Sequence, residues 1–165
     1  MRTVLKILGT GVLLIVAVLF VFGWLLTTGY VPDSKVVSGD TLSASVIEDL
    51  RDEGIIDGDE RIKYFYSEDL FSFVNYGNLY TDRHVISYEI DSDTNTRNIY
   101  SAKFADISDL QFLESEEVFS DSIIDVYVNG EVEFSLVVSN EEGGDETFFN
   151  SLERFWQNKL SASSP

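Results

Sequence analysis

Residues 7–26, ILGTGVLLIVAVLFVFGWLL, form an apolar run without a charged residue. At about 1.5 Å per helical residue, such a run can cross a hydrocarbon layer of about 30 Å. Trp24 and Tyr30 stand on its C-terminal side, where aromatic residues favour the membrane interface. A cleaved signal peptide is the alternative, but its apolar region spans about 7–15 residues and ends at a small-x-small site. The pattern therefore predicts an uncleaved transmembrane anchor within residues 1–30.

The basic residues around this run predict its orientation. Arg2 and Lys6 precede the run, and Lys35 is the first basic residue after it. Because basic residues stay on the cytoplasmic side, we expect a single-pass signal-anchor protein of the cell (inner) membrane. The chain from about residue 33 onward would then lie outside the cytoplasm. The opposite insertion, with the domain inside, is the alternative.

Composition limits what the rest of the chain can be. With 165 residues, 44% of them hydrophobic, one compact domain is expected. A net charge of −18 repels phosphate backbones, so nucleic acid is not an expected partner. The absence of cysteine excludes disulfides, thiolate nucleophiles and lipid-modified cysteine. Two explanations of the acidic excess stay open: a basic or metal-bridged protein partner, and adaptation to a salty habitat.

Residues 31–57 predict a short juxtamembrane linker followed by a short helix. Thr41 or Ser43 can cap a helix over about residues 44–53, and Gly54 fits the left-handed position after its end. One side of this helix is apolar, through Val46, Ile47 and Leu50.

From Arg61 onward the hydrophobic period changes to two, and β-branched and aromatic residues become frequent. Turn signals separate these segments at Tyr76-Gly77-Asn78, at Asp91 to Asn95 and at Asn129-Gly130. Six strands are predicted, over residues 61–67, 70–76, 78–90, 96–104, 123–128 and 131–139. Short turns between them favour an antiparallel meander that closes as a sandwich or barrel.

Residues 143–146, Gly-Gly-Asp-Glu, match most of the turn that is characteristic of diguanylate cyclases. A cyclase needs a long catalytic fold after that turn, whereas only about twenty residues follow here. Phe148, Leu152 and Trp156 instead recur at helical spacing, with Phe149 and Phe155 widening the apolar stripe. The prediction is therefore an amphipathic helix with Asp145 as its N-cap, followed by a polar tail at 161–165.

The single histidine, His84, follows Asp82 by two residues, so the two side chains would share one face of a strand. An Asp-His pair can orient a general base. No motif supplies a matching nucleophile, so we interpret both as structural residues and expect no catalytic residue and no enzyme.

Asp91, Asp93 and Asn95 have the spacing that begins a helical-hairpin calcium loop. Thr96 replaces the turn glycine and Ala102 stands where the bidentate glutamate belongs, so the interpretation is a polar hairpin tip. A second acidic run comprises Glu114, Glu116, Glu117, Asp121 and Asp125. Solvated loop and edge-strand charges explain this run, and no metal or cofactor is expected.

Residues 58–160 resemble the bacterial PH-like (pleckstrin-homology/GRAM-like) superfamily. The strand pattern of that family is matched by Leu79, Thr81, Asp82, Arg83, His84 and Ile86, and its closing helix by residues 148–156. The resemblance implies an α+β fold: a bent antiparallel sandwich of about seven strands, capped by a C-terminal amphipathic helix. Arg83 and His84 would then be structural strand residues.

The resemblance also implies a function. PH-like domains are usually binding or scaffolding modules, and the phosphoinositide-binding members use Lys and Arg around the first hairpin. Here that region carries Glu68 and Asp69 instead, so no phosphoinositide binding is expected. The leading hypothesis is a membrane-anchored, non-enzymatic module with a protein partner. The alternative is a divalent-cation or ligand-responsive envelope sensor that uses Asp91, Asp93, Asn95 or the acidic run.

Overall fold

The computed structural model describes Phe20 and residues 35–68, 72–91, 93–94, 96–115 and 120–163. Apart from Phe20, the expected anchor at 7–26 lies outside the described residues, as do Arg2, Lys6 and Tyr30. Within the described part of the chain, no helix has both the length and the apolar character that a membrane span requires. Contacts divide the chain into two units, Met1–Val31 and Pro32–Pro165.

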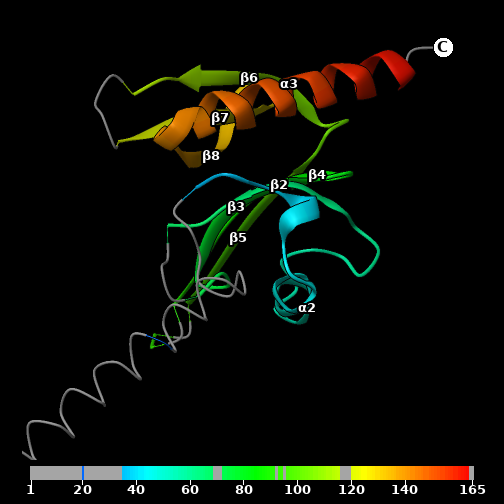
Figure 1. Cartoon of the computed structure of the whole chain (residues 1–165). Helices are drawn as coiled ribbons and strands as arrows, with labels where there is room; N and C mark the ends of the chain where they lie inside the picture. The colour runs from blue at the N-terminus through cyan, green and yellow to red at the C-terminus, as the bar shows by residue number, and fades with distance from the viewer. Residues whose placement is uncertain are drawn as a thin grey trace, which may run out of the picture. The chain divides into compact units, whose positions relative to one another are not determined.

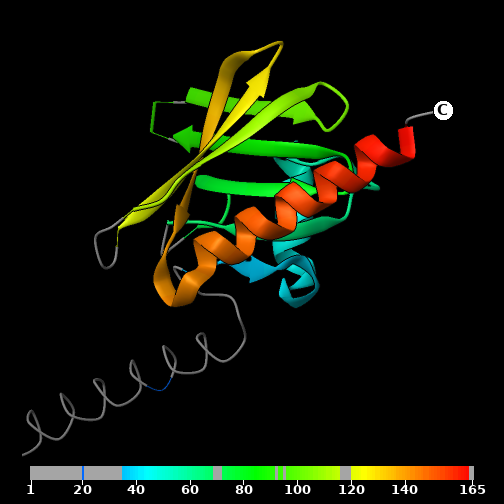
Figure 2. The same ribbon diagram turned by 90° about the horizontal axis from the view of Figure 1, so that it is seen from above.

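Two antiparallel sheets form the framework of the second unit (Figure 1). The first sheet has the order β1-β2-β3-β4-β5, with bounds Val37–Ser38, Ile62–Tyr66, Tyr76–Thr81, His84–Asp91 and Thr96–Lys103. The second has the order β6-β7-β8, with bounds Ile107–Leu113, Asp121–Val128 and Glu131–Ser139. Helix α3, Gly144–Ser163, follows the second sheet; in Figure 2 it runs diagonally over the strands of the first sheet and alongside the second. The predicted sandwich with a closing C-terminal helix is confirmed.

The larger core lies between the two sheets and α3. Phe148 and Leu152 are fully buried there, whereas Phe149, Phe155 and Trp156 are partly buried against the same core. The apolar stripe predicted for this helix is therefore the face that packs on the sheets. Hydrogen bonds between the sheets add to this packing: Asn78 Nδ2 donates to the Val137 carbonyl at 2.8 Å, and the Tyr66 hydroxyl donates to Asp121 Oδ1 at 3.3 Å.

A smaller core lies on the opposite face of the first sheet, beneath helix α2, Ala44–Asp52. The predicted helix is confirmed: the Ser43 side chain accepts the Val46 N–H at 3.4 Å, and Gly54 is left-handed at φ 66°. Its buried residues pack on the sheet together with Phe65, Leu79, Ile86 and Tyr88. Strand β1 also lies in the range assigned to a linker, so residues 37–57 are an integral part of the sheet and its core.

The predicted strand over residues 78–90 is wrong as a single element. The chain ends β3 at Thr81, turns at Asp82 and Arg83, and returns as β4 from His84. Thr81 Oγ1 closes this turn by accepting the N–H groups of Arg83 and His84, both at 2.9 Å. The threonine hydroxyl stabilises this turn, and the sequence has no Gly, Pro or Asn-Gly here that would indicate a turn.

Two further strand predictions need correction. Residues 73–75 form a turn rather than a strand, and the expected turn at residues 76–78 is instead the start of β3. Strand β6 was not predicted, because a register shift between Ile107 and Asp109 interrupts its alternation. The strands at β2, β5, β7 and β8 are confirmed. So is the tight turn at Asn129-Gly130, where both residues have positive φ.

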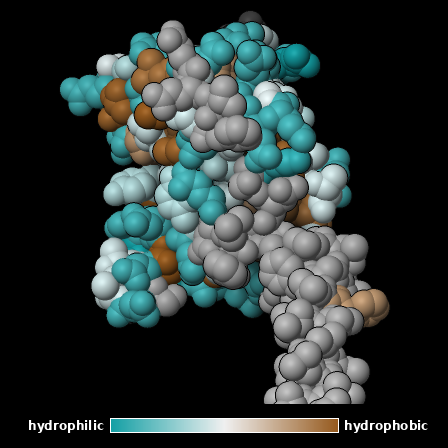
Figure 3. Space-filling model, turned by 60° about the vertical axis from the view of Figure 1, so that its left-hand side comes forward, coloured by the Kyte–Doolittle hydropathy of each residue, from teal (hydrophilic) through white to brown (hydrophobic). Residues whose placement is uncertain are grey.

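Where it is coloured, the face of the second unit seen in Figure 3 is mostly hydrophilic, with small separate hydrophobic patches. The exposed large hydrophobic residues of this unit are Ile99, Tyr100, Leu113, Ile123, Val132 and Leu160. Ile99 and Tyr100 lie on β5, which pairs only with β4 among the described strands. Strand β5 is therefore an open sheet edge.

Gly77 explains why the expected turn at residues 76–78 is a strand. It pairs with Tyr88, and a Cβ on Gly77 would lie 2.5 Å from Tyr88 Oη and 2.7 Å from its Cζ. Tyr88 is buried and donates its hydroxyl to the Phe73 carbonyl, so its ring cannot move away freely. Glycine is needed at position 77 because the Tyr88 ring lies close to its backbone, not because the chain turns there.

We expect Gly77→Ala to lower the free energy of unfolding by about 1–3 kcal/mol, because the added methyl overpacks the Tyr88 ring. Urea unfolding of the full chain measures this change. Gly58→Ala is the matched control: no atom lies within 4 Å of its added Cβ, so its effect should stay within about 0.5 kcal/mol. Equal losses in the two variants would contradict the close-approach explanation.

Candidate functional site: a hollow at the end of α3

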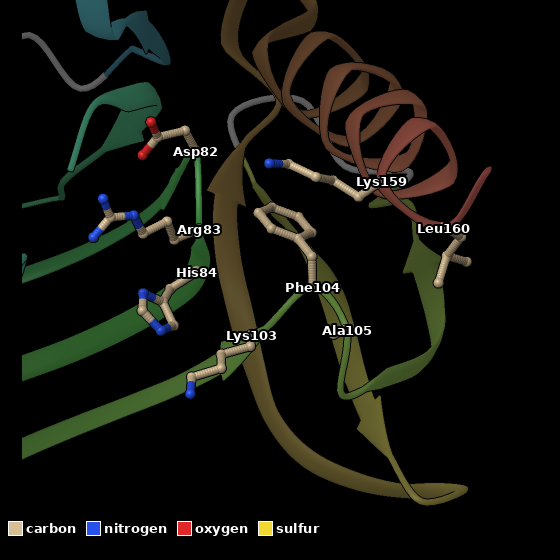
Figure 4. A pocket seen from close by; sticks show the side chains of 8 residues that line it. All are labelled: Asp82, Arg83, His84, Lys103, Phe104, Ala105, Lys159 and Leu160. Atoms are coloured by element: carbon tan, nitrogen blue, oxygen red, sulfur yellow. The ribbon is translucent and has the colours of Figure 1, made fainter. Parts of the chain in front are cut away.

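A hollow of about 290 Å³ lies where three segments of the second unit meet (Figure 4). These segments are the β3–β4 turn, the β5–β6 turn and the last part of α3. The lining residues are Asp82, Arg83, His84, Lys103, Phe104, Ala105, Lys159 and Leu160. Residues that are far apart in the sequence are thus brought to one place by the closing helix.

The base of the hollow is apolar and firmly held. The Phe104 ring is almost fully buried, with its centroid 5.1 Å from that of Phe155 and 6.4 Å from that of Tyr80. Ala105 and Leu160 complete the apolar lining, and Leu160 is 40% exposed. An apolar group of a ligand would therefore meet a rigid aromatic base and a more accessible aliphatic wall.

The rim of the hollow is cationic. Arg83, Lys103 and Lys159 line it, and the Lys63 ammonium lies 5.8 Å from the centroid of Phe155. These are four of the 11 Lys and Arg residues of a chain with net charge −18. Lys159 also lies near Phe155, with its ammonium 5.3 Å from the ring centroid. Positive charge is therefore concentrated at this place, against the overall sign of the chain.

The cations of the rim are not equivalent. Arg83 forms a bidentate pair with Asp59, which holds the pKa of that carboxyl below its usual range. In Figure 4 its guanidinium points away from Phe104, whereas the Lys159 side chain extends toward Phe104. Asp82, the acidic residue of the lining, accepts the backbone N–H of Arg61 at 3.1 Å. The Lys103 ammonium also points away from Phe104 in Figure 4, and Lys103 lines a neighbouring hollow with Asp106 and Glu133. Lys159 is therefore the cation that extends over the aromatic base.

The structure does not bring Asp82 and His84 together as a pair. Asp82 lies in the turn, so the expectation of a shared strand face is wrong. His84 Nδ1 instead lies 2.5 Å from Oε1 of Glu60, whose side chain is 1% exposed. The orientation of the His84 ring is thus fixed by a buried carboxylate.

A second hollow, of about 420 Å³, lies beside the β4–β5 turn and is acidic. It is lined by Asn75, Tyr76, Glu89, Ile90, Asp91 and Asp93. Asp91 closes the turn: its Oδ1 accepts the N–H groups of Asp93 and Thr94, and its Oδ2 accepts the Thr94 hydroxyl at 2.7 Å. These hydrogen bonds lower the pKa of Asp91. The polar hairpin tip is confirmed, although Asn95 lies outside the described residues.

The other acidic candidates serve the fold in the part that the structure describes. Asp125 accepts the Ser135 hydroxyl at 2.5 Å, and Asp121 accepts the Tyr66 hydroxyl at 3.3 Å. Glu116 and Glu117 lie outside the described residues. No group of three or more metal-binding side chains occurs among the residues that were placed.

The Gly-Gly-Asp-Glu segment begins a helix, as predicted, but Asp145 is not its N-cap. Helix α3 starts at Gly144, immediately after the left-handed Gly143, which places Asp145 in the first turn. The Asp145 carboxylate is almost fully buried: it accepts the Ser122 hydroxyl at 2.5 Å and the Glu146 N–H at 2.8 Å. It therefore ties the helix to β7 while facing the positive end of the helix dipole.

Sequence reasoning singled out Asp82, Arg83 and His84, but it missed the other residues that line the hollow and did not predict that these segments meet. Phe104 and Lys159 are 55 positions apart, and no local motif joins them. Two sequence features could have indicated the hollow. One is Lys159 beside the apolar Leu160 at the end of the amphipathic stripe, and the other is the aromatic Phe104 next to Lys103. Their significance depends on where α3 ends over the sheets.

No protein-family model matches the chain, and no curated protein matches it. Solved bacterial structures are similar in fold. A DUF1696 family protein with a pleckstrin-homology domain from Shewanella loihica is 14% identical, covers 77% of this chain and 97% of its own, and has a TM-score of 0.48. A pleckstrin homology domain from Shewanella amazonensis is 16% identical over 69% of this chain and 97% of its own, with a TM-score of 0.46.

A third structure is a PH domain containing protein from Exiguobacterium sibiricum. It is 16% identical over 65% of this chain and 53% of its own, with a TM-score of 0.40. Similarity at this level assigns no family, ligand or activity to this chain.

Glu68 predicts how stability depends on pH. Glu68 is exposed by surface area, but partial desolvation together with hydrogen bonding to the Asp121 carboxyl raises its pKa from 4.5 to about 7. Between these values the native state holds a proton that the unfolded state has released. The free energy of unfolding should therefore fall as pH rises from about 4.5 to 7.

We expect Glu68→Gln to flatten this fall, because the amide does not titrate. Urea unfolding at pH 5 and at pH 7.5 measures the difference for both proteins. Glu131→Gln makes the same change of charge at an exposed position of β8 and should leave the fall in place. A pH dependence that persists in Glu68→Gln would contradict the assignment.

Proposed function

We propose that this chain is a membrane-anchored, non-enzymatic binding module whose PH-like domain docks a partner protein at the hollow beside the end of α3. The observation that carries the proposal is the combination of an apolar base, formed by Phe104, with cationic residues in the lining, of which Lys159 extends over that base. On a chain of net charge −18, such a site selects its partner by local complementarity rather than by the overall field.

The chemistry of the lining supports binding rather than catalysis. The hollow has no Ser, Thr, Tyr or Cys side chain in its lining, so the lining residues include no hydroxyl or thiol nucleophile. His84 is directed to the buried Glu60 carboxylate. Lysine ammonium groups beside an aromatic base can hold an anion and an apolar group together, which is a recognition task.

The overall charge supports a protein partner rather than a lipid surface. A flat anionic membrane would approach the acidic surface around the hollow as closely as the hollow itself, and the two like charges would repel each other. Near the first hairpin, where phosphoinositide-binding relatives carry cations, the described hollow is lined by Glu89, Asp91 and Asp93. A narrow segment of a protein can instead enter the hollow without bringing a large charged surface close to the acidic residues around it.

The anchor is the second part of the proposal. Residues 7–26 are apolar and uncharged, and Arg2 and Lys6 precede them, so we propose a single span with the binding domain outside the cytoplasm. The partner would then be an envelope protein.

Cysteine labelling tests the orientation, because the chain has no native cysteine. We expect an impermeant maleimide to label Ser163→Cys in intact cells, and to label Thr3→Cys only after lysis. Blotting for a mass-tagged maleimide measures both. The reverse pattern would place the domain in the cytoplasm and direct the search to partners there.

Site-directed photo-crosslinking tests the docking site. With benzoylphenylalanine at Leu160 of the full chain, we expect a discrete crosslinked product in cells; Leu113, which is 51% exposed on β6, serves as the control position. Adding Lys103→Glu and Lys159→Glu should reduce the Leu160 product about tenfold, because two charges that favour binding become repulsive. Equal products from both positions, or no effect of the charge reversal, would contradict docking at this hollow.

A further inference from the structure

We propose that the outer edge of β5 is a second docking site, which binds an extended basic segment of a partner protein as an added antiparallel strand. The proposal goes beyond the docking at the end of α3 and does not depend on it. The occupant is a segment in which a lysine or arginine lies two residues before a β-branched or aromatic residue.

The register of β4 and β5 shows which backbone groups of β5 face outward. The Phe104 N–H donates to the Arg83 carbonyl at 3.3 Å, directly beyond the pair formed by His84 and Lys103. In an antiparallel ladder, hydrogen-bonded pairs alternate with pairs that are not hydrogen-bonded. Every second residue of β5 therefore directs its N–H and C=O groups away from β4. These outward-facing residues are Arg97, Ile99, Ser101 and Lys103.

The outward-facing groups in the middle of β5 are open to a partner. In the part of the chain that the structure describes, β5 pairs with β4 alone, and no group outside β4 bonds to the backbone of Ile99 or Ser101. The Lys103 carbonyl accepts the Asp106 N–H at 2.9 Å, which ends the open edge at the β5–β6 turn. Ile99 is 36% exposed and Tyr100 50%. An unpaired row of this kind is a template for an added strand.

A hollow of about 220 Å³ at the C-terminal end of this edge sets the charge of the occupant. Ala102 of β5 and Val128 of β7 give it an apolar part, and Asp106 and Glu133 contribute two carboxylates. Neither carboxylate bonds to another of the described residues. Lys103 supplies one ammonium to the same lining. Carboxylates therefore outnumber ammonium groups here, and a basic side chain is the complementary one.

The direction of the added strand sets the spacing of the occupant's residues. Its side chains opposite Ala102 and Tyr100 lie two residues apart and share the face of β5 that is turned to the second sheet. The side chain opposite Ala102 meets the hollow, where a lysine or arginine can cover Val128 with its stem. The side chain opposite Tyr100 meets a ring that stacks on Phe134, with centroids 6.3 Å apart. A β-branched or aromatic residue suits that position.

The overall charge favours this occupant over a second copy of the chain. Two copies of net charge −18 repel each other as their edges approach. A basic segment is instead attracted by the same charge, and only a single strand has to come close to the edge.

Peptide titration of the full chain in neutral-detergent micelles tests the proposal. The probe is an end-blocked peptide, Ser-Lys-Thr-Val-Thr-Ser, and in the control peptide Glu replaces Lys. Methyl NMR signals of Ile99, Ala102 and Val128 report on the edge, and those of Leu113 and Leu160 report on other places. We expect the Lys peptide to shift the first three signals alone. The Glu peptide should bind about tenfold more weakly, because attraction to two carboxylates becomes repulsion.

Methylation of single peptide amides distinguishes an added strand from other modes of binding. The first Thr would lie opposite Ser101 and exchange two hydrogen bonds with it. The Val would lie opposite Tyr100, with its N–H directed away from β5. We expect N-methylation of that Thr to weaken binding about tenfold, because a hydrogen bond is lost and a methyl group separates the strands. N-methylation of the Val is the matched control and should change the affinity less than about twofold.

A charge swap in the protein tests the contribution of the hollow. In Glu133→Lys we expect the preference to reverse toward the Glu peptide, because ammonium groups then outnumber carboxylates in the lining. Glu114→Lys makes the same change in net charge at an exposed position after the opposite end of β6. That variant should keep the preference for the Lys peptide.

The other outcomes overturn the proposal. Equal weakening by the two N-methyl groups excludes an antiparallel strand in this register, and equal affinity for the Lys and Glu peptides excludes a basic occupant. Shifts at Leu160 in place of Ile99 move the binding to the hollow at the end of α3. Shifts of Ile99 that follow protein concentration, together with self-association in sedimentation, assign the edge to a second copy. Without any shift at millimolar peptide the second site is wrong, and crosslinking at Leu160 still tests the first.

Discussion

The packing of the aromatic face of α3 on the two sheets is the interaction on which the rest of this structure depends. The Phe148 ring lies 5.4 Å from Tyr80 of the first sheet, and the Phe149 ring lies 4.8 Å from Phe112 of the second, measured between centroids. One helix thus holds both sheets at once. Because the helix is rigid, this packing also fixes where its last turns end, and therefore where Lys159 meets Phe104.

Local and overall electrostatics have opposite signs in this molecule. Acidic residues outnumber basic ones by 29 to 11, and exposed charges act at a distance of about 8–10 Å before salt screens them. The lining of the hollow holds Arg83, Lys103 and Lys159 against the single carboxylate of Asp82, so its local charge is opposite in sign to that of the whole chain. Composition could not reveal this, because net charge says nothing about arrangement.

The sequence predicted the elements that have a regular period and failed where side chains replace the usual signals. The stripe of Phe148, Leu152 and Trp156 correctly predicted α3, and Asn129-Gly130 predicted its hairpin. The turn at Asp82 was missed because a threonine hydroxyl closes it. Gly77 was misread because a close approach and a turn both require glycine. The hollow was beyond prediction, since it depends on the end of α3 meeting two turns that are distant in the sequence.

The open edge of β5 gives the acidic excess a physical role that requires no partner. Over Thr96–Lys103 this strand has no carboxylate, proline or register shift, and it exposes Ile99 and Tyr100. Such an edge is a template for pairing with another chain. Two copies of the chain that approach edge to edge each carry a net charge of −18. The electrostatic repulsion between them opposes pairing of the two edges. The acidic excess thus adds to the protection that the charged residues Arg97 and Lys103 give the strand itself, and this added protection is weakest where salt or acid removes the repulsion.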